Sequence, residues 1–218
     1  MNIKDNVEKF LREIPEDVRI VAATKTRSAE EINRAISAGI KIIGENYVQE
    51  LRKEWDKLEG DFEFHVIGHL QRNKVKYIID KADMIQSLDS LRLAKEINKR
   101  AKKIPRTVDV LLEVNSGEEE NKNGIMPSNL IPLLKEISQF ENLRIKGLMT
   151  MAPFFDNPEK MRPYFRRTKE LFEKIKTMDL DNVKMKYLSM GMSGSYKVAI
   201  EEGANMVRIG TGIFGPRK

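Results

Sequence analysis

The chain contains no cysteine and only two histidines in its 218 residues. The absence of cysteine excludes disulfide bonds and thiolate metal sites. His65 and His69 lie four positions apart but lack the glutamate of the zinc-binding helix motif, and any further ligands would be scattered carboxylates. The sequence therefore predicts no metal site, with His65 at the edge of the core and His69 in a pocket.

Long apolar runs and blocks of like charge are missing as well. No apolar segment approaches the roughly 20 residues that span a bilayer. The N-terminal segment MNIKDNVEKFLREI is charged throughout and places apolar residues at helical spacing, which predicts an amphipathic helix, not a signal peptide. The 39 basic and 33 acidic residues are spread along the chain. We therefore expect a cytoplasmic protein with no membrane or nucleic-acid partner, whose basic surface can hold small anions.

Strand and helix patterns alternate along the whole sequence. Apolar, β-branched segments predict eight strands, at residues 19–25, 41–45, 62–68, 84–88, 108–115, 145–151, 185–190 and 206–210. A helical pattern follows each strand except the last. Ser28 and Glu31 form a capping box for one of these helices. We also expect a helix carrying Val48, Leu51, Trp55 and Leu58, one around residues 75–79, one capped by Asp89, and a long one opened by Pro158.

The number of strands separates two architectures. A doubly wound open sheet of the flavodoxin or Rossmann type usually has five or six strands. A (β/α)8 TIM barrel has eight, and 218 residues allow roughly 27 for each unit. No composition shift or linker divides the chain. The sequence therefore predicts an α/β fold, a single-domain barrel over residues 1–218, in which the N-terminal helix replaces the missing last outer helix.

Lys25 ends the first predicted strand, in the segment VAATKTRS. The ordinary interpretation is a lysine whose stem packs inside while its amine reaches water. In a barrel, however, the chemistry lies at the carboxyl ends of the strands, where a lysine can form a Schiff base with a carbonyl compound. Other polar residues at predicted strand ends should meet at the same mouth, namely Glu45, Asn46, His69, Asn115, Thr150, Ser189 and Arg208.

Two glycine-rich segments follow the last two predicted strands. They are SMGMSGS at 189–195 and RIGTGIFG at 208–215. The second formally matches the dinucleotide fingerprint, but the helix and distant acidic residue of that motif do not follow it. Barrels often bind phosphate in the loops after strands seven and eight. A phosphate site is therefore favoured over the alternative that both segments are simple turns.

Six segments carry a family pattern, and they follow one another in order between residues 22 and 217: AATKTRSAEEI, GENYVQEL, FHVIGHLQRNKVKYI, LEVNSGEEENKNGI, IKGLMTM and LSMGMSGSYKVAIEEGANMVRIGTGIFGPR. Together they resemble the pyridoxal phosphate homeostasis proteins, a family similar to the barrel domain of alanine racemase. The resemblance implies pyridoxal 5′-phosphate held as a Schiff base by Lys25, its phosphate near Ser193, Gly210 and Thr211, and its ring nitrogen near Arg208. The implied cofactor-binding set is Lys25, Asn46, His69, Ser189, Ser193, Arg208, Gly210 and Thr211. Lys122 matches a family lysine in a segment that departs locally from the family pattern.

Two functions remain open at this stage. An arginine at the ring nitrogen leaves that nitrogen unprotonated and the ring a poorer electron sink, which favours a carrier that delivers the cofactor to apo-enzymes. The expected lack of a second domain favours a monomer. The structural alternative for Arg208 is a salt bridge with Glu45 or Glu113. The functional alternative is a one-domain amino-acid racemase, which needs a second base opposite Lys25. No tyrosine is an evident candidate for that base. A barrel aldolase that uses Lys25 fits the residues but not the resemblance.

Overall fold

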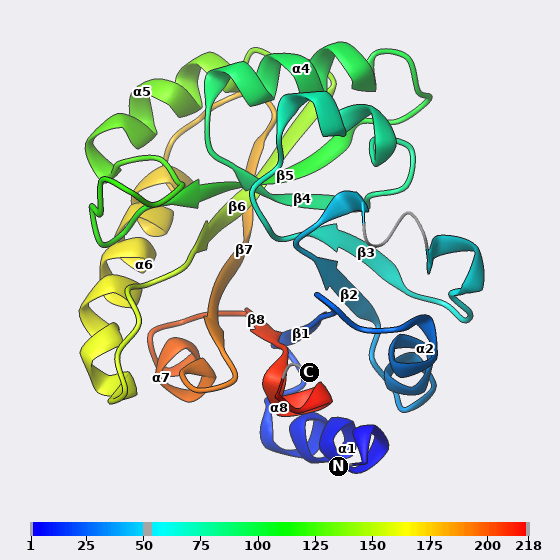
Figure 1. Cartoon of the computed structure of the whole chain (residues 1–218). Coiled ribbons are helices and arrows are strands. Elements are labelled where there is room, and N and C mark those ends of the chain that lie inside the picture. Colours follow the sequence, from blue (N-terminus) through cyan, green and yellow to red (C-terminus); the bar gives the residue numbers. More distant parts are fainter. Residues whose placement is uncertain (1, 50–53, 217–218) are drawn as a thin grey trace.

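The computed structural model describes residues 2–49 and 54–216, and its centre is a closed barrel of eight parallel strands (Figure 1). Each strand pairs with its neighbours in sequence, and β8 closes onto β1 with Arg208 opposite Val21. The strands are β1 (Arg19–Ala23), β2 (Ile42–Glu45), β3 (Glu63–Val66), β4 (Met84–Leu88), β5 (Val108–Val114), β6 (Leu143–Thr150), β7 (Val183–Met192) and β8 (Met206–Ile209). The predicted barrel is thus confirmed, and the open doubly wound sheet is wrong.

Helices surround the barrel and cover the outward side chains of the strands (Figure 1). The α-helices are α1 (Ile3–Glu13), α2 (Ala29–Ser37), α4 (Leu91–Ala101), α5 (Pro127–Ile137), α6 (Arg162–Lys176), α7 (Tyr196–Glu201) and α8 (Thr211–Phe214). The 3-10 helices are η1 (Trp55–Lys57), η2 (Arg72–Tyr77) and η3 (Pro158–Met161). Within residues 2–49 and 54–216, no helix combines the length and apolar character needed to cross a membrane.

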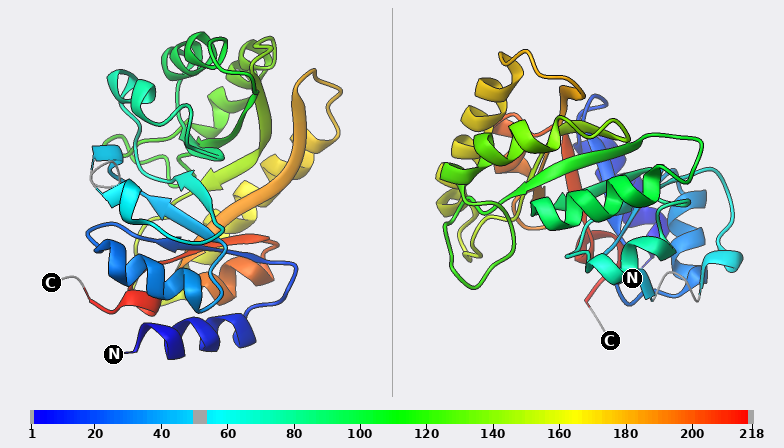
Figure 2. Two further views of the ribbon diagram at one scale, coloured as in Figure 1. Left: turned by 90° about the vertical axis from the view of Figure 1, so that its right-hand side faces the viewer. Right: turned by 90° about the horizontal axis from the view of Figure 1, so that it is seen from above.

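The N-terminal helix takes the outer position next to β8, as expected. Figure 2 shows α1 lying beside the short α8 at one end of the molecule. Val7 and Phe10 of α1 belong to one buried cluster with Ile209, Ile213 and Phe214. The α8 turn was not predicted, because four residues are too few to show helical periodicity.

Several local expectations need correction. The predicted helix around residues 75–79 is the 3-10 helix η2, which ends at Tyr77. Ser90, not Asp89, caps α4 by accepting a hydrogen bond from the Leu93 N–H. Part of the helix expected to carry Leu51 lies outside the described residues, and Trp55 lies in the 3-10 helix η1. The Ser28–Glu31 capping box of α2 is confirmed, with both of its hydrogen bonds present.

The barrel interior is divided into apolar and polar parts. Side chains alternate between the two faces of a strand, and two small apolar clusters separate from the outer core lie inside the barrel. They comprise Val21, Ile42, Ile67, Met206, Met84, Leu111 and Met149. Between them, four polar side chains are buried at 4% exposure or less, namely His65, Gln86, Ser189 and Arg208. His65 is therefore inside the barrel, and the prediction that it sits at the core edge is wrong.

Candidate functional site

A cavity of about 510 Å³ opens at the carboxyl ends of the strands. This volume falls within the ordinary range for small-molecule sites. Its walls come from β1, from the ends of β7 and β8, and from the segments that follow β2, β3, β6, β7 and β8. The polar residues in these walls are Asn46, Asp156, Ser193, Ser195, Arg208 and Thr211. The two glycine-rich segments therefore share one cavity, although α7 lies between them in the sequence.

Backbone N–H groups converge on the Ser193 hydroxyl at one side of this cavity. The N–H groups of Gly210 and Gly212 donate to its oxygen at 3.3 and 3.0 Å. Next to it, the Ser195 hydroxyl accepts from the Met192 N–H at 3.1 Å. Two donors directed at a single oxygen form the kind of concavity that binds an anion. The predicted residues Ser193, Gly210 and Thr211 are thus adjacent and line the same wall.

Arg27 holds the segment after β8 in place. Its guanidinium donates to the carbonyl of Gly215 at 2.6 Å and lies 5.5 Å from the centre of the Phe214 ring. The same side chain pairs with Glu31 in the first turn of α2. The start of α2 and the glycine-rich segment are therefore fastened together. We did not single out Arg27 from the sequence, because its partner is a carbonyl oxygen almost 190 residues away.

Arg208 is buried in the wall of the cavity at 4% exposure. It donates to the Ser189 hydroxyl at 2.7 Å and to the Thr150 carbonyl at 2.8 Å. Burial lowers the pKa of Arg208 to about 10, and the nearby carboxyl of Glu113 opposes that shift. The guanidinium therefore remains charged at neutral pH, and its hydrogen bonds go to a hydroxyl and a carbonyl, not to Glu45 or Glu113.

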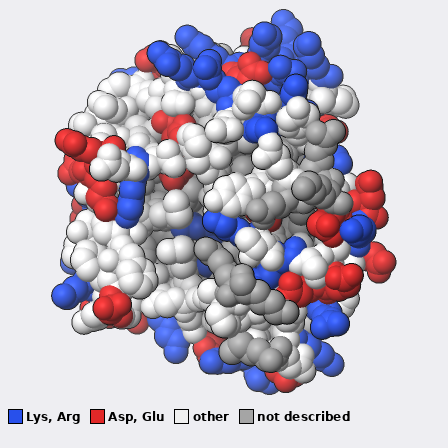
Figure 3. All heavy atoms as spheres, in the orientation of Figure 1, with Lys and Arg blue, Asp and Glu red and all other residues white. Residues whose placement is uncertain are grey.

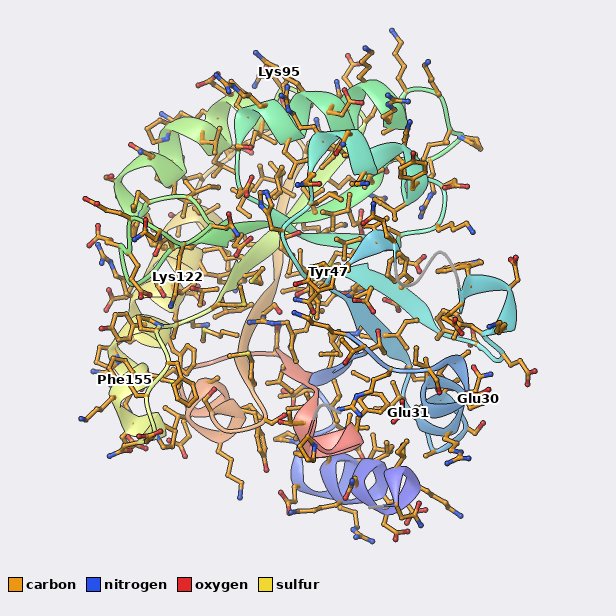
Figure 4. All side chains as sticks on the ribbon, in the orientation of Figure 1. Glu30, Glu31, Tyr47, Lys95, Lys122 and Phe155 are labelled. Carbon is orange, nitrogen blue, oxygen red and sulfur yellow. The ribbon has the colours of Figure 1, made fainter. Side chains whose placement is uncertain are left out.

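Lys25 stands beside the cavity with its amine next to Tyr47. The distance from Lys25 Nζ to Tyr47 Oη is 3.0 Å, and the amine lies 4.4 Å from the ring centre. Figure 4 shows Tyr47 over the middle of the barrel, well apart from Lys122. Thr26, directly after the lysine, has a left-handed φ of 64°, which is strained for a β-branched residue. The lysine is thus presented on a sharply bent loop at the mouth.

Glu45 ties the loops after β1 and β2 together. One carboxylate oxygen accepts from the N–H groups of Asn46 and Tyr47 at 2.6 and 2.9 Å, and the other accepts from the Thr24 hydroxyl at 3.1 Å. The side chain is buried at 3% exposure. Glu45, which the sequence placed at the mouth, therefore positions Asn46 and Tyr47 beside Lys25.

Two of the predicted cofactor-binding residues, His69 and Ser189, do not line the cavity, and neither does Lys122. His69 does not line the 510 Å³ cavity; its Nδ1 lies 3.0 Å from Asp89 Oδ2 between two neighbouring hollows. Ser189 is fully buried beneath Arg208 instead of facing the cavity. Lys122 pairs with Glu119 at 2.6 Å on the loop after β5. Asn46 lines both the main cavity and its neighbour.

The rim of the mouth carries large apolar side chains. Those exposed by more than a third are Tyr47, Met151, Phe154 and Met192. Figure 3 shows uncharged atoms over much of this face, with lysine and arginine side chains gathered along the edge above α4. Within the described part of the chain, no group of three or more histidine or acidic side chains is arranged to hold a metal ion.

Comparison with known proteins gives consistent matches along the whole chain. The sequence family described as "Alanine racemase, N-terminal domain" matches residues 1–218. A protein of Aquifex aeolicus named "Pyridoxal phosphate homeostasis protein" is 47% identical over 201 residues, covering 92% of this chain and 87% of that protein. A protein of the same name from Haemophilus influenzae is 37% identical, covering 92% and 85%.

Solved structures agree with these sequence matches. PipY of Synechococcus elongatus, solved with PLP bound, is 29% identical with a TM-score of 0.90, over 98% of this chain and 100% of that chain. A Clostridium difficile alanine racemase is 16% identical with a TM-score of 0.77. This chain covers 57% of that racemase, so the likeness is one of fold between the barrel and a part of the larger enzyme.

Proposed function

Because this chain belongs to the family of pyridoxal phosphate homeostasis proteins, we propose that it binds pyridoxal 5′-phosphate as a Schiff base on Lys25 and serves in its homeostasis with little or no turnover. The bound cofactor supplies an aldehyde for the lysine, a phosphate anion and an aromatic ring with a basic nitrogen. The residues of the cavity fit each of these three parts.

The phosphate fits the hydroxyls of Ser193 and Thr211, and it would take over the N–H groups of Gly210 and Gly212 that now donate to the Ser193 oxygen. The ring nitrogen fits the buried guanidinium of Arg208, which has N–H donors beyond the two used for Ser189 and Thr150. The aldehyde fits Lys25, whose flexible four-carbon stem lets the amine turn from Tyr47 into the cavity.

The buried position of Arg208 in the cavity wall is the observation that supports the proposed lack of turnover. A carboxylate is the usual partner of the ring nitrogen in enzymes that use this cofactor. Here a charged arginine, locked by two hydrogen bonds of 2.7 and 2.8 Å, takes that place in the wall. Since an arginine donates but does not accept a proton, it keeps the nitrogen unprotonated and the ring a weak electron sink. A mouth rimmed by exposed side chains supports entry and release of the cofactor, with apo-enzymes as the proposed recipients.

The phosphate site gives a first test. We expect pyridoxal, which lacks the phosphate, to bind at least about tenfold more weakly than pyridoxal 5′-phosphate, because charge-assisted hydrogen bonds of the anion are lost. Equilibrium dialysis with each compound measures this difference. Ser193→Ala, which removes the hydroxyl on which the two N–H groups converge, should weaken only the phosphorylated compound. Equal affinities for the two compounds would show that the glycine-rich segments are plain turns.

Turnover separates the carrier from a racemase. Loaded protein is incubated with single-enantiomer alanine in deuterated water, and chirality and α-deuterium incorporation are followed over time. We expect rates far below the roughly 1 per second of ordinary enzymes, close to those of free cofactor at the same concentration. Tyr47 lies on the same side as Lys25, bonded to its amine, and so is not placed as an opposing base. Racemisation at ordinary enzyme rates would refute the carrier proposal.

A further inference from the structure

A continuous line of hydrogen bonds runs through the barrel interior from Arg208 at the mouth toward the amino ends of the strands. It links side chains from five strands, and we call it the polar column. Its members are Arg208 (β8), Ser189 (β7), Gln86 (β4), His65 (β3), Glu63 (β3) and Arg19 (β1). The four upper members are buried at 4% exposure or less, so water does not offer them alternative partners.

The direction of each hydrogen bond in the upper half is fixed by donor chemistry. Arg208 can only donate, so the Ser189 oxygen accepts at 2.7 Å and its own hydrogen is free to donate to Gln86 Oε1 at 2.7 Å. The Gln86 amide nitrogen then lies 2.8 Å from His65 Nδ1 and 3.2 Å from the Met206 sulfur. The Met206 thioether can only accept, so the Gln86 amide nitrogen, and not its oxygen, faces Met206 and His65.

The hydrogen bonds in the lower half of the polar column determine which nitrogen of His65 carries the hydrogen. An amide nitrogen only donates, so His65 Nδ1 must carry a lone pair, and Nε2 must carry the hydrogen in the neutral ring. Nε2 lies 3.3 Å from Glu63 Oε2, while Arg19 donates to Glu63 Oε1 at 2.6 Å. Burial lowers the pKa of His65, and hydrogen bonds from His65 and Arg19 lower the pKa of Glu63 to about 2. The ring is therefore neutral and the carboxylate charged at neutral pH.

We propose that Gln86 and His65 are positioning residues for Arg208. This inference rests on the proposed function, in which Arg208 contacts the cofactor ring. Glu63 sets the tautomer of His65, the tautomer sets the amide of Gln86, and the amide oxygen takes the hydrogen of Ser189. The Ser189 lone pairs then face Arg208, and the guanidinium is held in one orientation toward the cofactor ring. In this role, residue 86 must offer a hydrogen-bond acceptor to Ser189. If residue 86 served only for packing, a side chain of the same volume would be enough.

Two variants of similar volume separate these roles. Gln86→Met removes the acceptor for the Ser189 hydroxyl, which in turn supports the charged Arg208. We therefore expect the affinity for pyridoxal 5′-phosphate to fall about tenfold, the usual effect of losing one hydrogen bond. Gln86→Glu keeps the acceptor, and its carboxylate requires a protonated His65 Nδ1, so we expect affinity within about threefold of the original chain. Urea unfolding of each variant, measured in parallel, reports stability separately from affinity.

Nitrogen-15 NMR of the cofactor-free protein tests the direction of the column directly. The chain has only His65 and His69, so a His69→Gln variant assigns the two rings. We expect His65 at pH 7 as the neutral tautomer with hydrogen on Nε2 and, in Gln86→Glu, with both nitrogens protonated. A hydrogen on Nδ1 in the original chain, or equal affinity losses in the two Gln86 variants, would overturn the proposal. Failure of the original chain to bind the cofactor would instead refute the proposed function and leave the tautomer result decisive for the column.

Discussion

The Lys25→Ala variant is expected to lose all visible absorbance that the protein acquires with pyridoxal 5′-phosphate. The absorbance arises from the covalent bond between the lysine amine and the aldehyde, and alanine has no amine to form it. The phosphate and ring contacts of Ser193, Gly210 and Arg208 remain, so weak noncovalent binding should persist. Spectra of both proteins after gel filtration measure the difference.

Lys122→Ala is the matched control for this experiment. Lys122 is a second lysine on a loop at the carboxyl end of a strand, but its amine pairs with Glu119 at 2.6 Å. We expect the control to retain the absorbance and to lose it on addition of hydroxylamine, as the original chain does. Retention of the absorbance by Lys25→Ala, together with its loss in Lys122→Ala, would move the attachment point to the loop after β5.

The Glu113→Gln variant is expected to be markedly more stable than the original chain above neutral pH. Glu113 is buried on β5 at 3% exposure, and its Oε2 has no hydrogen-bond partner within the described part of the molecule. Burial, and then the nearby charge of Asp89, raise the pKa of Glu113 to about 7, while Arg208 opposes the shift. The neutral amide avoids the cost of ionising a buried carboxyl.

The size of this effect depends on pH. The pKa of Glu113 rises from 4.5 in the unfolded chain to about 7 in the folded one. Its contribution to stability is therefore fully present below pH 4.5 and is lost as the pH rises through 7. At 1.36 kcal/mol per pKa unit, the loss approaches about 3 kcal/mol at pH 8. Glutamine does not titrate, so Glu113→Gln should flatten the stability profile between pH 4.5 and 7.

Urea unfolding of the cofactor-free protein from pH 4.5 to 8 measures this profile. Glu120→Gln, a change of the same kind at an exposed position, is the control and should follow the original chain throughout. A Glu113→Gln profile parallel to that of the original chain would show that the buried carboxyl does not titrate in this window.

The barrel was predictable because the alternation of strand and helix patterns is visible in the sequence. Each strand is a short apolar segment, and eight of them in 218 residues leave no other common architecture. The Ser28–Glu31 capping box was readable for the same reason, since both partners lie within one turn. Errors occurred where two adjacent residues compete for one role: Ser90 caps α4, while Asp89 is engaged by His69.

The contacts that support the site were not predictable, because they join residues far apart in the sequence. Gln86 lies 103 positions from Ser189 and 21 from His65, and nothing in the neighbouring sequence indicates that this polar side chain is buried. Ser189 was placed at the mouth as a strand-end residue, whereas its inward side chain lies one layer below Arg208. Tyr47 was among the tyrosines that offered no evident opposing base, and its contact with Lys25 depends on how Glu45 shapes the loop after β2.

The central claim is that Lys25 carries pyridoxal 5′-phosphate at the mouth of this barrel, and borohydride reduction tests it most directly. Reduction of the loaded chain makes the bond between amine and cofactor permanent, and peptide mass mapping then locates it. We predict one modified peptide, containing Lys25, at close to one cofactor per chain. A modified peptide that contains Lys122 or another lysine in place of Lys25, or no modified peptide at all, would contradict the claim.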